Sequence, residues 1–211
     1  MLTVHHLNNS RSQRILWLLE ELGLEYQLKT YQRDPESNLA PPELEQIHPL
    51  GKSPVLTDDT ATIIESGAII DYILRHYGAG RLQPEQGTQG YEQYLQWLHY
   101  AEGSAMLPMM LKMYTARLGD AGAPLQARIS DELQRHLGYI EKALQGVDWL
   151  VDNCFSGADI QLSFVVEITP LLYSEEALPN ITAYRQRLQQ RPAYRAALER
   201  GGFYAYGSDT A

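Results

Sequence analysis

Polar side chains gather at residues 8–12, between a short apolar segment at residues 2–4 and an apolar helical stripe that follows. The hydroxyl groups of Ser10 and Ser12 would lie at the N-terminus of that helix, where unpaired backbone N–H groups and the helix dipole favour negative charge. A hydroxyl there could donate a hydrogen bond to an anion. It could equally cap the helix, which is a common role of serine at this position. The residue types alone leave both roles open.

A second group, Gly51-Lys52-Ser53-Pro54, comes directly before an apolar strand candidate. A proline at the start of a strand costs little, because its missing N–H can face a sheet edge. The ordinary expectation for such a proline is a trans bond. A cis bond would instead turn the backbone of Ser53 outward, where an extended peptide could pair with it.

The pair Glu65-Ser66 begins a helical stripe at residues 66–77. One interpretation is that Ser66 caps this helix and Glu65 is merely exposed. In the other, Ser66 and the helix N-terminus bind a carboxylate while Glu65 binds an ammonium group. An amino-acid head group carries both charges, so the pair is a candidate zwitterion clamp.

The sequence favours neither a metal site nor an intrachain disulfide. His5 and His6 are adjacent on a strand and face opposite ways, so they cannot chelate one metal together. The six histidines show no ligand spacing, and one cysteine, Cys154, makes neither a zinc site nor an intrachain disulfide. We expect no metal, and a lone cysteine fits a reducing, cytoplasmic compartment.

The spacing of apolar residues along the chain predicts two halves of different architecture. The first eighty residues read β-α-β-α-β-β-α, which gives a mixed sheet with parallel and antiparallel pairs. Its expected strands are residues 2–4, 26–30, 54–57 and 60–64, and its expected helices are residues 11–23, 43–47 and 66–77. A linker follows at residues 78–88, and only helical stripes come after it. Pro108 is expected to kink one of these helices.

Composition limits the partners. The chain has 211 residues, 44% of them hydrophobic, and a formal charge of −9 without any block of lysine or arginine. Nucleic acids and anionic membrane surfaces attract cationic proteins, so neither is an expected partner. No run approaches the eighteen or so apolar residues of a membrane span, and the N-terminal residues do not have the build of a signal peptide.

The order and spacing of these groups are similar to those of the soluble glutathione transferases, and the resemblance covers the whole chain. Ser10 stands four residues before Arg14, as the catalytic serine does in the serine-type classes of the family. Residues 51–56 look like the cis-proline segment of the family, and Glu65-Ser66 looks like its γ-glutamyl-binding pair. Ser156 and Asp159 match the capping box of its helical domain.

The resemblance implies an α/β, thioredoxin-like domain at residues 1–78, a linker at 79–88 and an all-helical bundle domain at 89–211. It also implies a cytoplasmic homodimer that conjugates glutathione to small hydrophobic electrophiles in detoxification, with glutathione as co-substrate and no cofactor. Ser10 would be the catalytic residue. The residues implied to bind glutathione are Lys52, Ser53, Pro54, Glu65 and Ser66.

Alternatives remain at this stage. Asn9 or Ser12 could replace Ser10, in a glutathione-dependent peroxidase or disulfide-bond reductase. A non-catalytic binding protein with the same fold is a further alternative. The chain also departs from the family pattern, because it has no tyrosine near the end of the first strand and no cysteine near position 10. The position that often contacts the glycine carboxylate lies near Asn38, where the sequence assigns no basic residue.

Overall fold

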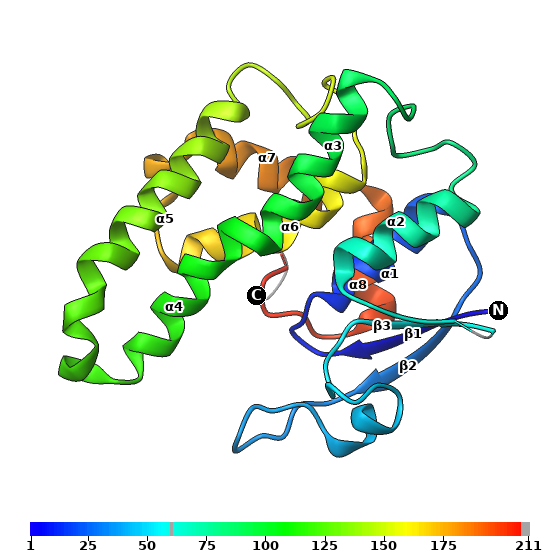
Figure 1. Cartoon of the computed structure of the whole chain (residues 1–211), viewed down its shortest axis with the longest axis horizontal. Helices are drawn as coiled ribbons and strands as arrows, with labels where there is room; N and C mark the ends of the chain where they lie inside the picture. Colours follow the sequence, from blue (N-terminus) through cyan, green and yellow to red (C-terminus); the bar gives the residue numbers. More distant parts are fainter. Residues whose placement is uncertain (60, 208–211) are drawn as a thin grey trace. The chain divides into compact units, whose positions relative to one another are not determined.

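Figure 1 shows the chain as a computed structural model that describes residues 1–59 and 61–207. By packing, the chain forms two compact units. One contains Met1–Gln83 together with the segment that begins at Gln186, and the other contains Pro84–Arg185. The C-terminal segment therefore packs with the first unit, although it follows the helical stretch in sequence. The expected domain boundaries at residues 78 and 89 stay a prediction.

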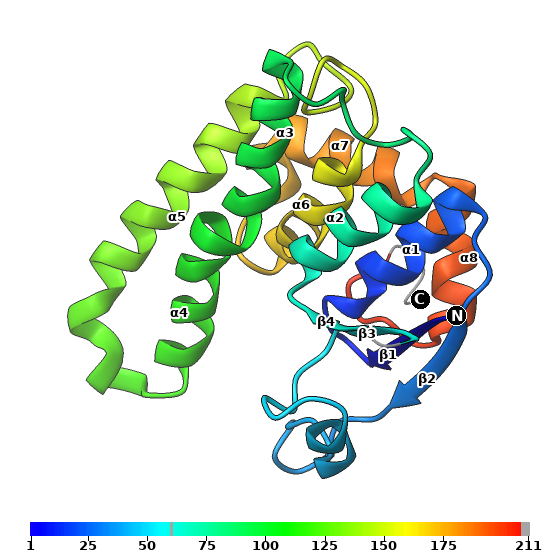
Figure 2. The ribbon, with the colours of Figure 1, turned by 45° about the vertical axis from the view of Figure 1, so that its right-hand side comes forward.

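The first unit is built on a four-stranded mixed sheet with the order β2-β1-β3-β4 (Figure 2). Its strands are β1 (Leu2–Leu7), β2 (Gln27–Tyr31), β3 (Val55–Asp58) and β4 (Ala61–Ile64). β1 pairs parallel with β2 and antiparallel with β3, and β3 pairs antiparallel with β4. The expected mixed sheet is thus confirmed. Thr60, which was expected to begin the last strand, lies outside the described residues.

Helices α1 (Ser12–Leu22) and α2 (Ser66–Tyr77) pack on this sheet, and α8 (Pro192–Gly201) packs against α1 (Figure 1). The short expected helix near residue 43 is a 3₁₀ helix, η1 (Pro42–Gln46). α1 is apolar nearly all round because neighbours cover it on several sides. Trp17 of α1, for example, meets the edge of Tyr194 of α8 with ring centroids 5.2 Å apart.

Ion pairs attach the C-terminal segment to α1. Arg191 Nε lies 2.5 Å from Glu21 Oε1, and Arg200 Nη1 lies 3.0 Å from Glu20 Oε1. The two residues of the first pair are 170 positions apart in sequence and those of the second are 180 apart, so no local pattern predicts either ion pair. α8 therefore completes the packing of α1 rather than that of the helical unit.

The second unit is wholly helical in its regular structure. Its elements are α3 (Gln89–Tyr100), the π-helix η2 (Ala101–Ala105), α4 (Met106–Ala116), η3 (Gly119–Gly122), α5 (Ala123–Ala143), α6 (Gly157–Ile168), η4 (Thr169–Leu171), η5 (Glu175–Ala177) and most of α7 (Pro179–Gln189). Every residue of α6 is buried, so this helix forms the centre of the unit. The expected fold class, a thioredoxin-like α/β part and an all-α part, is confirmed.

The expected interruption near Pro108 takes the form of a π turn. Proline lacks an N–H and its ring clashes with the carbonyl four residues earlier, here that of Ser104. The five π-helical residues, Ala101–Ala105, contain this carbonyl and precede Pro108 in α4. Among the helices of the described residues, none is long and apolar enough to cross a membrane.

Candidate functional site

Ser10 and Ser12 form a buried chain of hydrogen bonds with His6. Ser12 Oγ lies 2.7 Å from Ser10 Oγ and 2.8 Å from His6 Nδ1. Burial lowers the pKa of His6 to about 4, partly offset by a hydrogen bond to the backbone of Gly201. The imidazole is therefore neutral near pH 7. Because its second nitrogen bonds the carbonyl of Gly201, we place the proton there and assign Nδ1 as the acceptor of the Ser12 hydroxyl.

This arrangement gives the two serines different roles. Ser12 is fully buried and its proton is engaged by His6, so its hydroxyl is fixed in the interior. Ser10 is 5% exposed, accepts the N–H of Ser12 at 3.2 Å, and must donate its own proton to Ser12 Oγ in this arrangement. Rotation of the Ser10 hydroxyl would direct that proton to another acceptor. Of the two, Ser10 is the better candidate donor to a ligand.

Asn9 is engaged by the C-terminal segment. Its backbone has φ of 50°, in the left-handed region, where asparagine is one of the more tolerant residues. Its side-chain Oδ1 accepts the N–H of Ala205 at 2.7 Å. The side-chain carbonyl of Asn9 thus holds the tail, which weakens its candidacy as an alternative catalytic group.

The bond between Ser53 and Pro54 is cis, so the feature suggested by the resemblance is present. Ser53 Oγ donates to the carbonyl of His5 at 2.9 Å and accepts the N–H of Leu7 at 3.2 Å. The side chain of Ser53 therefore fastens this loop to β1 and leaves its backbone for a ligand. Lys52 is exposed.

The N–H of Leu7 links two of the predicted groups. It donates to Ser53 Oγ at 3.2 Å and to Ser12 Oγ at 3.3 Å. The loop before β3 and Ser12 at the start of α1 are therefore connected through one backbone group at the end of β1. The sequence pattern names the members of both groups but not this connection.

Ser66 is positioned by α1. It is buried, and its Oγ accepts a hydrogen bond from Arg14 Nη1 at 3.1 Å. No side-chain capping bond is formed at the start of α2, so the capping interpretation of Ser66 is wrong. Glu65 is exposed and has φ of 67°, an unusual conformation for a residue with a side chain. Within the described residues, its carboxylate makes no hydrogen bond or ion pair, which leaves it available to an ammonium group.

Arg33 is the functional candidate that sequence reasoning missed. Its Nη1 donates to the carbonyl of Asn38 at 3.0 Å, in the loop where the sequence assigned no basic residue. Its Nε and Nη2 reach back to the carbonyls of Asn8 and Asn9, beside Ser10. No signal in the sequence separates Arg33 from the other arginines, because these contacts depend on how two loops meet. As for metals, the described residues contain no cluster of three ligating side chains.

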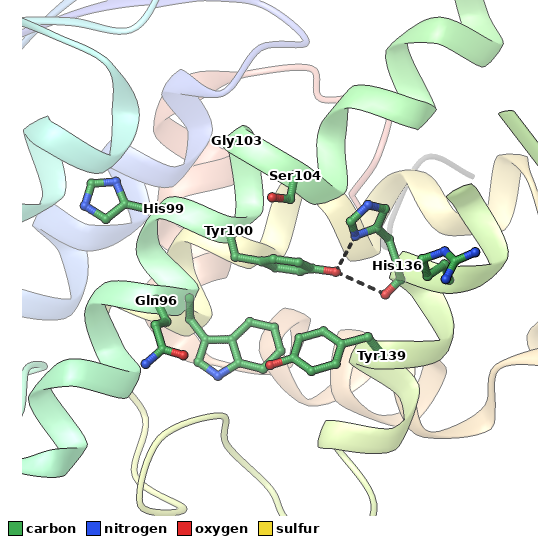
Figure 3. Close-up of a pocket in the computed structure, with 9 residues that line it drawn as sticks. Gln96, His99, Tyr100, Gly103, Ser104, His136 and Tyr139 are labelled. Carbon is green, nitrogen blue, oxygen red and sulfur yellow. Dashed lines mark hydrogen bonds between the residues drawn. The ribbon is translucent and has the colours of Figure 1, made fainter. Parts of the chain in front are cut away.

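The helical unit has a separate pocket of about 660 Å³ between α3 and α5 (Figure 3). Trp97 and Tyr139 stack with ring centroids 5.2 Å apart, and Tyr100 meets both rings nearly edge-on. Tyr100 Oη lies 2.9 Å from Nδ1 of His136, and burial raises the pKa of this phenol. The pocket therefore has an aromatic wall, and its other lining residues include Gln96, His99, Ser104, Arg135 and His136.

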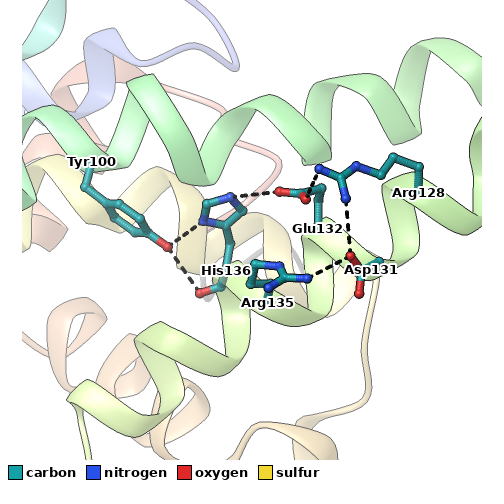
Figure 4. A network of polar contacts seen from close by, with 6 residues as sticks. All are labelled: Tyr100, Arg128, Asp131, Glu132, Arg135 and His136. Atoms are coloured by element: carbon teal, nitrogen blue, oxygen red, sulfur yellow. Dashed lines mark hydrogen bonds and ion pairs between the residues drawn. The ribbon is translucent and has the colours of Figure 1, made fainter.

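Charged side chains of both signs flank this pocket on α5 (Figure 4). Arg128 pairs with Glu132 at 2.7 Å, and Arg135 pairs with Asp131 at 3.0 Å. Glu132 also lies 3.4 Å from His136 Nε2. Arg128, Asp131 and Arg135 are exposed, so the ion pairs that they form contribute little to folding.

Comparisons with known proteins agree across the chain. Residues 1–75 match the family described as "Glutathione S-transferase, N-terminal domain", and residues 103–192 match "Glutathione S-transferase, C-terminal domain". The chain is 34% identical to Glutathione S-transferase 3 of Schizosaccharomyces pombe, over 95% of this chain and 88% of the relative. It is 31% identical to Glutathione S-transferase 1 of Saccharomyces cerevisiae, over 95% of each.

Solved structures give the same result. A glutathione S-transferase from Actinobacillus pleuropneumoniae superposes with a TM-score of 0.88 at 35% identity, over 95% of this chain and 93% of that one. A sphingomonad glutathione S-transferase, solved in complex with glutathione, superposes with a TM-score of 0.77 at 25% identity, over 95% and 99%.

Proposed function

The chain belongs to the glutathione S-transferase family, and we propose that it conjugates the thiolate of glutathione to small electrophilic substrates. The family and the enzyme class expected from the sequence are confirmed. One observation carries the assignment to particular residues. The serines at the start of α1, the cis-proline loop and the start of α2 are joined through Leu7 N–H and Arg14. They thus form one connected framework within a single unit.

The proposed chemistry requires the thiolate, because the thiol itself is a weak nucleophile with a pKa of about 8.5. Ser10 donates a hydrogen bond to the sulfur, and the N-terminus of α1 favours the negative charge. A developing or full anion is stabilised by such a donor more than the neutral thiol is. No metal or cofactor takes part in this proposal, and glutathione is the co-substrate.

The remaining groups hold the tripeptide. The carboxylate of Glu65 binds the γ-glutamyl ammonium group, while Ser66 and the N-terminus of α2 bind the γ-glutamyl carboxylate. The backbone of Ser53, turned by the cis bond to Pro54, pairs with the extended peptide, and Lys52 supplies positive charge beside it. The glutathione complex of the sphingomonad relative supports the choice of ligand.

Calorimetry with glutathione and steady-state assays test this function together. We expect measurable binding below millimolar glutathione and turnover of a chlorinated aromatic electrophile. Turnover of only a hydroperoxide or only a mixed disulfide would contradict conjugation and favour the peroxidase or reductase alternative. Absence of binding up to millimolar glutathione would favour a non-catalytic binding protein.

The second copy of a homodimer is proposed to cover the aromatic pocket of the helical unit. Aromatic side chains are enriched at the centres of protein interfaces, and Tyr139 is 52% exposed here. The flanking charges on α5 have both signs, so the same face can be complementary to itself, as a two-fold interface requires. The lone cysteine, Cys154, supports the proposed location in the reducing cytoplasm, and conjugation of electrophiles there would serve detoxification.

Size-exclusion chromatography with light scattering tests the dimer. Tyr139→Glu should yield a monomer, whereas Leu171→Glu, at a 68% exposed apolar residue of η4, should leave the dimer intact. A monomeric wild-type protein at micromolar concentration would contradict the proposal.

A further inference from the structure

The side chain of Arg33, just beyond β2, crosses to the loop that joins β1 to α1. Its Nε donates to the carbonyl of Asn8 at 3.2 Å, and its Nη2 donates to the carbonyl of Asn9 at 3.4 Å. Its Nη1 donates to the carbonyl of Asn38 at 3.0 Å. The Asn8 side chain adds a fourth bond by accepting the backbone N–H of Arg33 at 2.9 Å. The guanidinium is therefore fixed by neutral groups on both sides.

These contacts leave the positive charge of Arg33 uncompensated by a neighbouring anion. Within residues 1–59 and 61–207, no carboxylate pairs with Arg33, whereas Arg191 of the same unit pairs with Glu21. Burial lowers the pKa of Arg33, an effect opposed by Tyr206 and reinforced by Arg11. A guanidinium nevertheless stays protonated in proteins. A half-buried cation thus lies behind the loop that carries Ser10.

Peptide geometry transmits this charge to the other side of the loop. The carbonyl of Asn9 and the N–H of Ser10 belong to one planar trans peptide group, so they point in opposite directions. The carbonyl of Asn8 and the N–H of Asn9 are related in the same way. A cation at each carbonyl oxygen polarises its peptide group and strengthens the N–H as a donor. The φ of 50° at Asn9 is part of the turn that presents both carbonyls to Arg33.

We propose that Arg33 is a positioning residue for thiolate formation: it orients the amide groups of Asn9 and Ser10 and supplies the charge that favours the anionic sulfur. This inference rests on the proposed function, because the sulfur is that of bound glutathione. Ser10 touches the sulfur, and Arg33 acts through the two peptide groups and through space. Its effect is specific to the charge of the sulfur, so it should change the ionisation of the thiol more than the affinity for the tripeptide.

The ultraviolet absorbance of bound thiolate and the pH profile of kcat/KM test the role of Arg33. We expect Arg33→Gln to raise the pKa of the bound thiol by about one unit. The rate below the wild-type pKa should then fall about tenfold and recover at higher pH. The dissociation constant of glutathione should change less than about threefold. Arg33→Lys keeps the charge but cannot span three carbonyls, so it should give an intermediate shift.

Arg81 offers a matched control in the same unit. Its Nε donates to the carbonyl of Gly78 at 3.2 Å and its Nη2 to that of Leu22 at 3.1 Å. Arg81→Gln therefore removes a guanidinium that also bonds backbone carbonyls, but at the end of α1 far along the helix from Ser10. It should leave the ionisation of bound glutathione unchanged.

Two results would overturn the inference. One is a wild-type thiol pKa in soluble Arg33→Gln, and the other is a tenfold or greater loss of glutathione affinity with that pKa unchanged. The second result would make Arg33 a direct contact of the tripeptide. If Arg33→Gln does not fold, Asn38→Asp tests the role of the Arg33 charge instead. This variant keeps Arg33 and adds an exposed negative charge beside its guanidinium.

We expect Asn38→Asp to raise the pKa of the bound thiol by a few tenths of a unit at low ionic strength and less at high salt. No rise at low ionic strength would contradict the role of the charge. Failure of the proposed function looks different. In that case the wild-type protein itself would bind no glutathione, or would bind it with the pKa of about 8.5 of a free thiol.

Discussion

Arg14 of α1 donates a hydrogen bond from Nη1 to Oγ of Ser66, the first residue of α2, over a distance of 3.1 Å. Both side chains are buried, at 1% and 4% exposure. The bond therefore joins two helices and also fixes the hydroxyl at the N-terminus of α2. Glu65, the preceding residue, has no such role, since its side chain is exposed. The two members of the proposed zwitterion clamp thus differ in what they contribute to folding.

Ser66→Ala should weaken both folding and glutathione binding. It removes the acceptor of a buried Arg14 donor, which costs about 1–3 kcal/mol of unfolding free energy. For a chain of this size, that lowers the melting temperature by about 2–4 °C per kcal/mol. Loss of one charge-assisted hydrogen bond should raise the glutathione KM about tenfold. Thermal melting and steady-state kinetics measure the two effects separately.

Glu65→Ala is the matched comparison. It should raise the glutathione KM by a similar factor without lowering the melting temperature, because the side chain of Glu65 makes no hydrogen bond or ion pair within the described residues. In both variants kcat at saturation should change little, since the γ-glutamyl end lies far from the reacting sulfur. A large fall in kcat with an unchanged KM would refute the clamp.

Asp58 at the end of β3 should make folding sensitive to acid. Its buried carboxylate accepts hydrogen bonds from Tyr77 and from Tyr72, the latter at 2.9 Å, and lies 3.4 Å from the Met1 amine. The bond from Tyr77 is the main cause that lowers the pKa of Asp58, and the same contact raises the pKa of Tyr77 to about 12. A carboxyl whose pKa is lower in the folded state stabilises the fold above its unfolded pKa of about 4. That stabilisation is lost as the pH falls through the folded value.

Asp58→Asn should therefore cost about 1–3 kcal/mol at pH 7, and the difference from wild type should shrink below about pH 4. Urea unfolding at several pH values measures this difference. Asp59→Asn is the control, because Asp59 also binds the Met1 amine, at 2.7 Å, but is 82% exposed. A stability difference for Asp58→Asn that does not depend on pH would show that the charge of Asp58 is irrelevant to folding.

The sequence predicted those helices and strands whose bounds depend on residues close together in the chain. The helix predicted at residues 66–77 is α2, Ser66–Tyr77, because its apolar stripe and the following Gly78 lie within one short window. The first strand was predicted too short. His5 and His6 are polar, and the contacts that accompany their burial include long-range ones with Tyr31 and Gly201. Those partners come from β2 and from the end of α8, which no local pattern can identify.

The candidate site shows the same limit. The types and spacing of Ser10, Ser53 and Ser66 could be predicted, but not the bonds that hold each of them. For Ser66 the sequence left helix capping and carboxylate binding open, and it did not predict that the hydroxyl accepts a bond from Arg14, 52 residues earlier. Arg33 could not be selected at all, since its role depends on the meeting of two loops. Long-range contacts decide these roles.

Asp159→Ala should destabilise the helical unit by more than the loss of a helix cap alone would. The capping box with Ser156 is present, with Ser156 N 2.8 Å from Asp159 Oδ2. Asp159 Oδ1 also accepts the N–H of Leu150 at 3.1 Å and the hydroxyl of Tyr184 at 2.8 Å. Burial raises the pKa of Asp159, although these hydrogen bonds oppose the effect. The alanine variant leaves several buried donors without an acceptor. We therefore expect the free energy of unfolding to fall by about 3–5 kcal/mol rather than by about 1 kcal/mol.

Chemical unfolding of Asp159→Ala measures this loss, and Asp131→Ala serves as the control at a 51% exposed position on α5. The control should stay within about 0.5 kcal/mol of wild type. Activity per folded molecule should be nearly unchanged in both variants. Normal stability of Asp159→Ala with abolished turnover would reverse the assignment and give Asp159 a direct part in the reaction.

Ser10→Ala and Ser12→Ala should separate chemistry from folding. Ser10 contacts the protein through Ser12 alone among its described side-chain bonds, and it is the more accessible hydroxyl. Its loss should lower kcat on the order of 10²-fold while glutathione stays bound, as removal of an oxyanion-type donor does. The pKa of the bound thiol should rise, because the lost donor favours the thiolate over the thiol.

Ser12→Ala removes a group that bonds His6, Ser10 and the N–H of Leu7. It leaves buried partners unsatisfied, so it should cost about 1–3 kcal/mol of unfolding free energy. Ser10 then loses the acceptor that holds its proton away from the sulfur, and its hydroxyl can still donate to the thiolate. Turnover per folded molecule should therefore fall far less than in Ser10→Ala. Thiolate absorbance against pH, measured for wild type and both variants, decides between the two serines. Superimposable titrations of Ser10→Ala and wild type, with equal turnover, would transfer the catalytic role to Asn9 or Ser12.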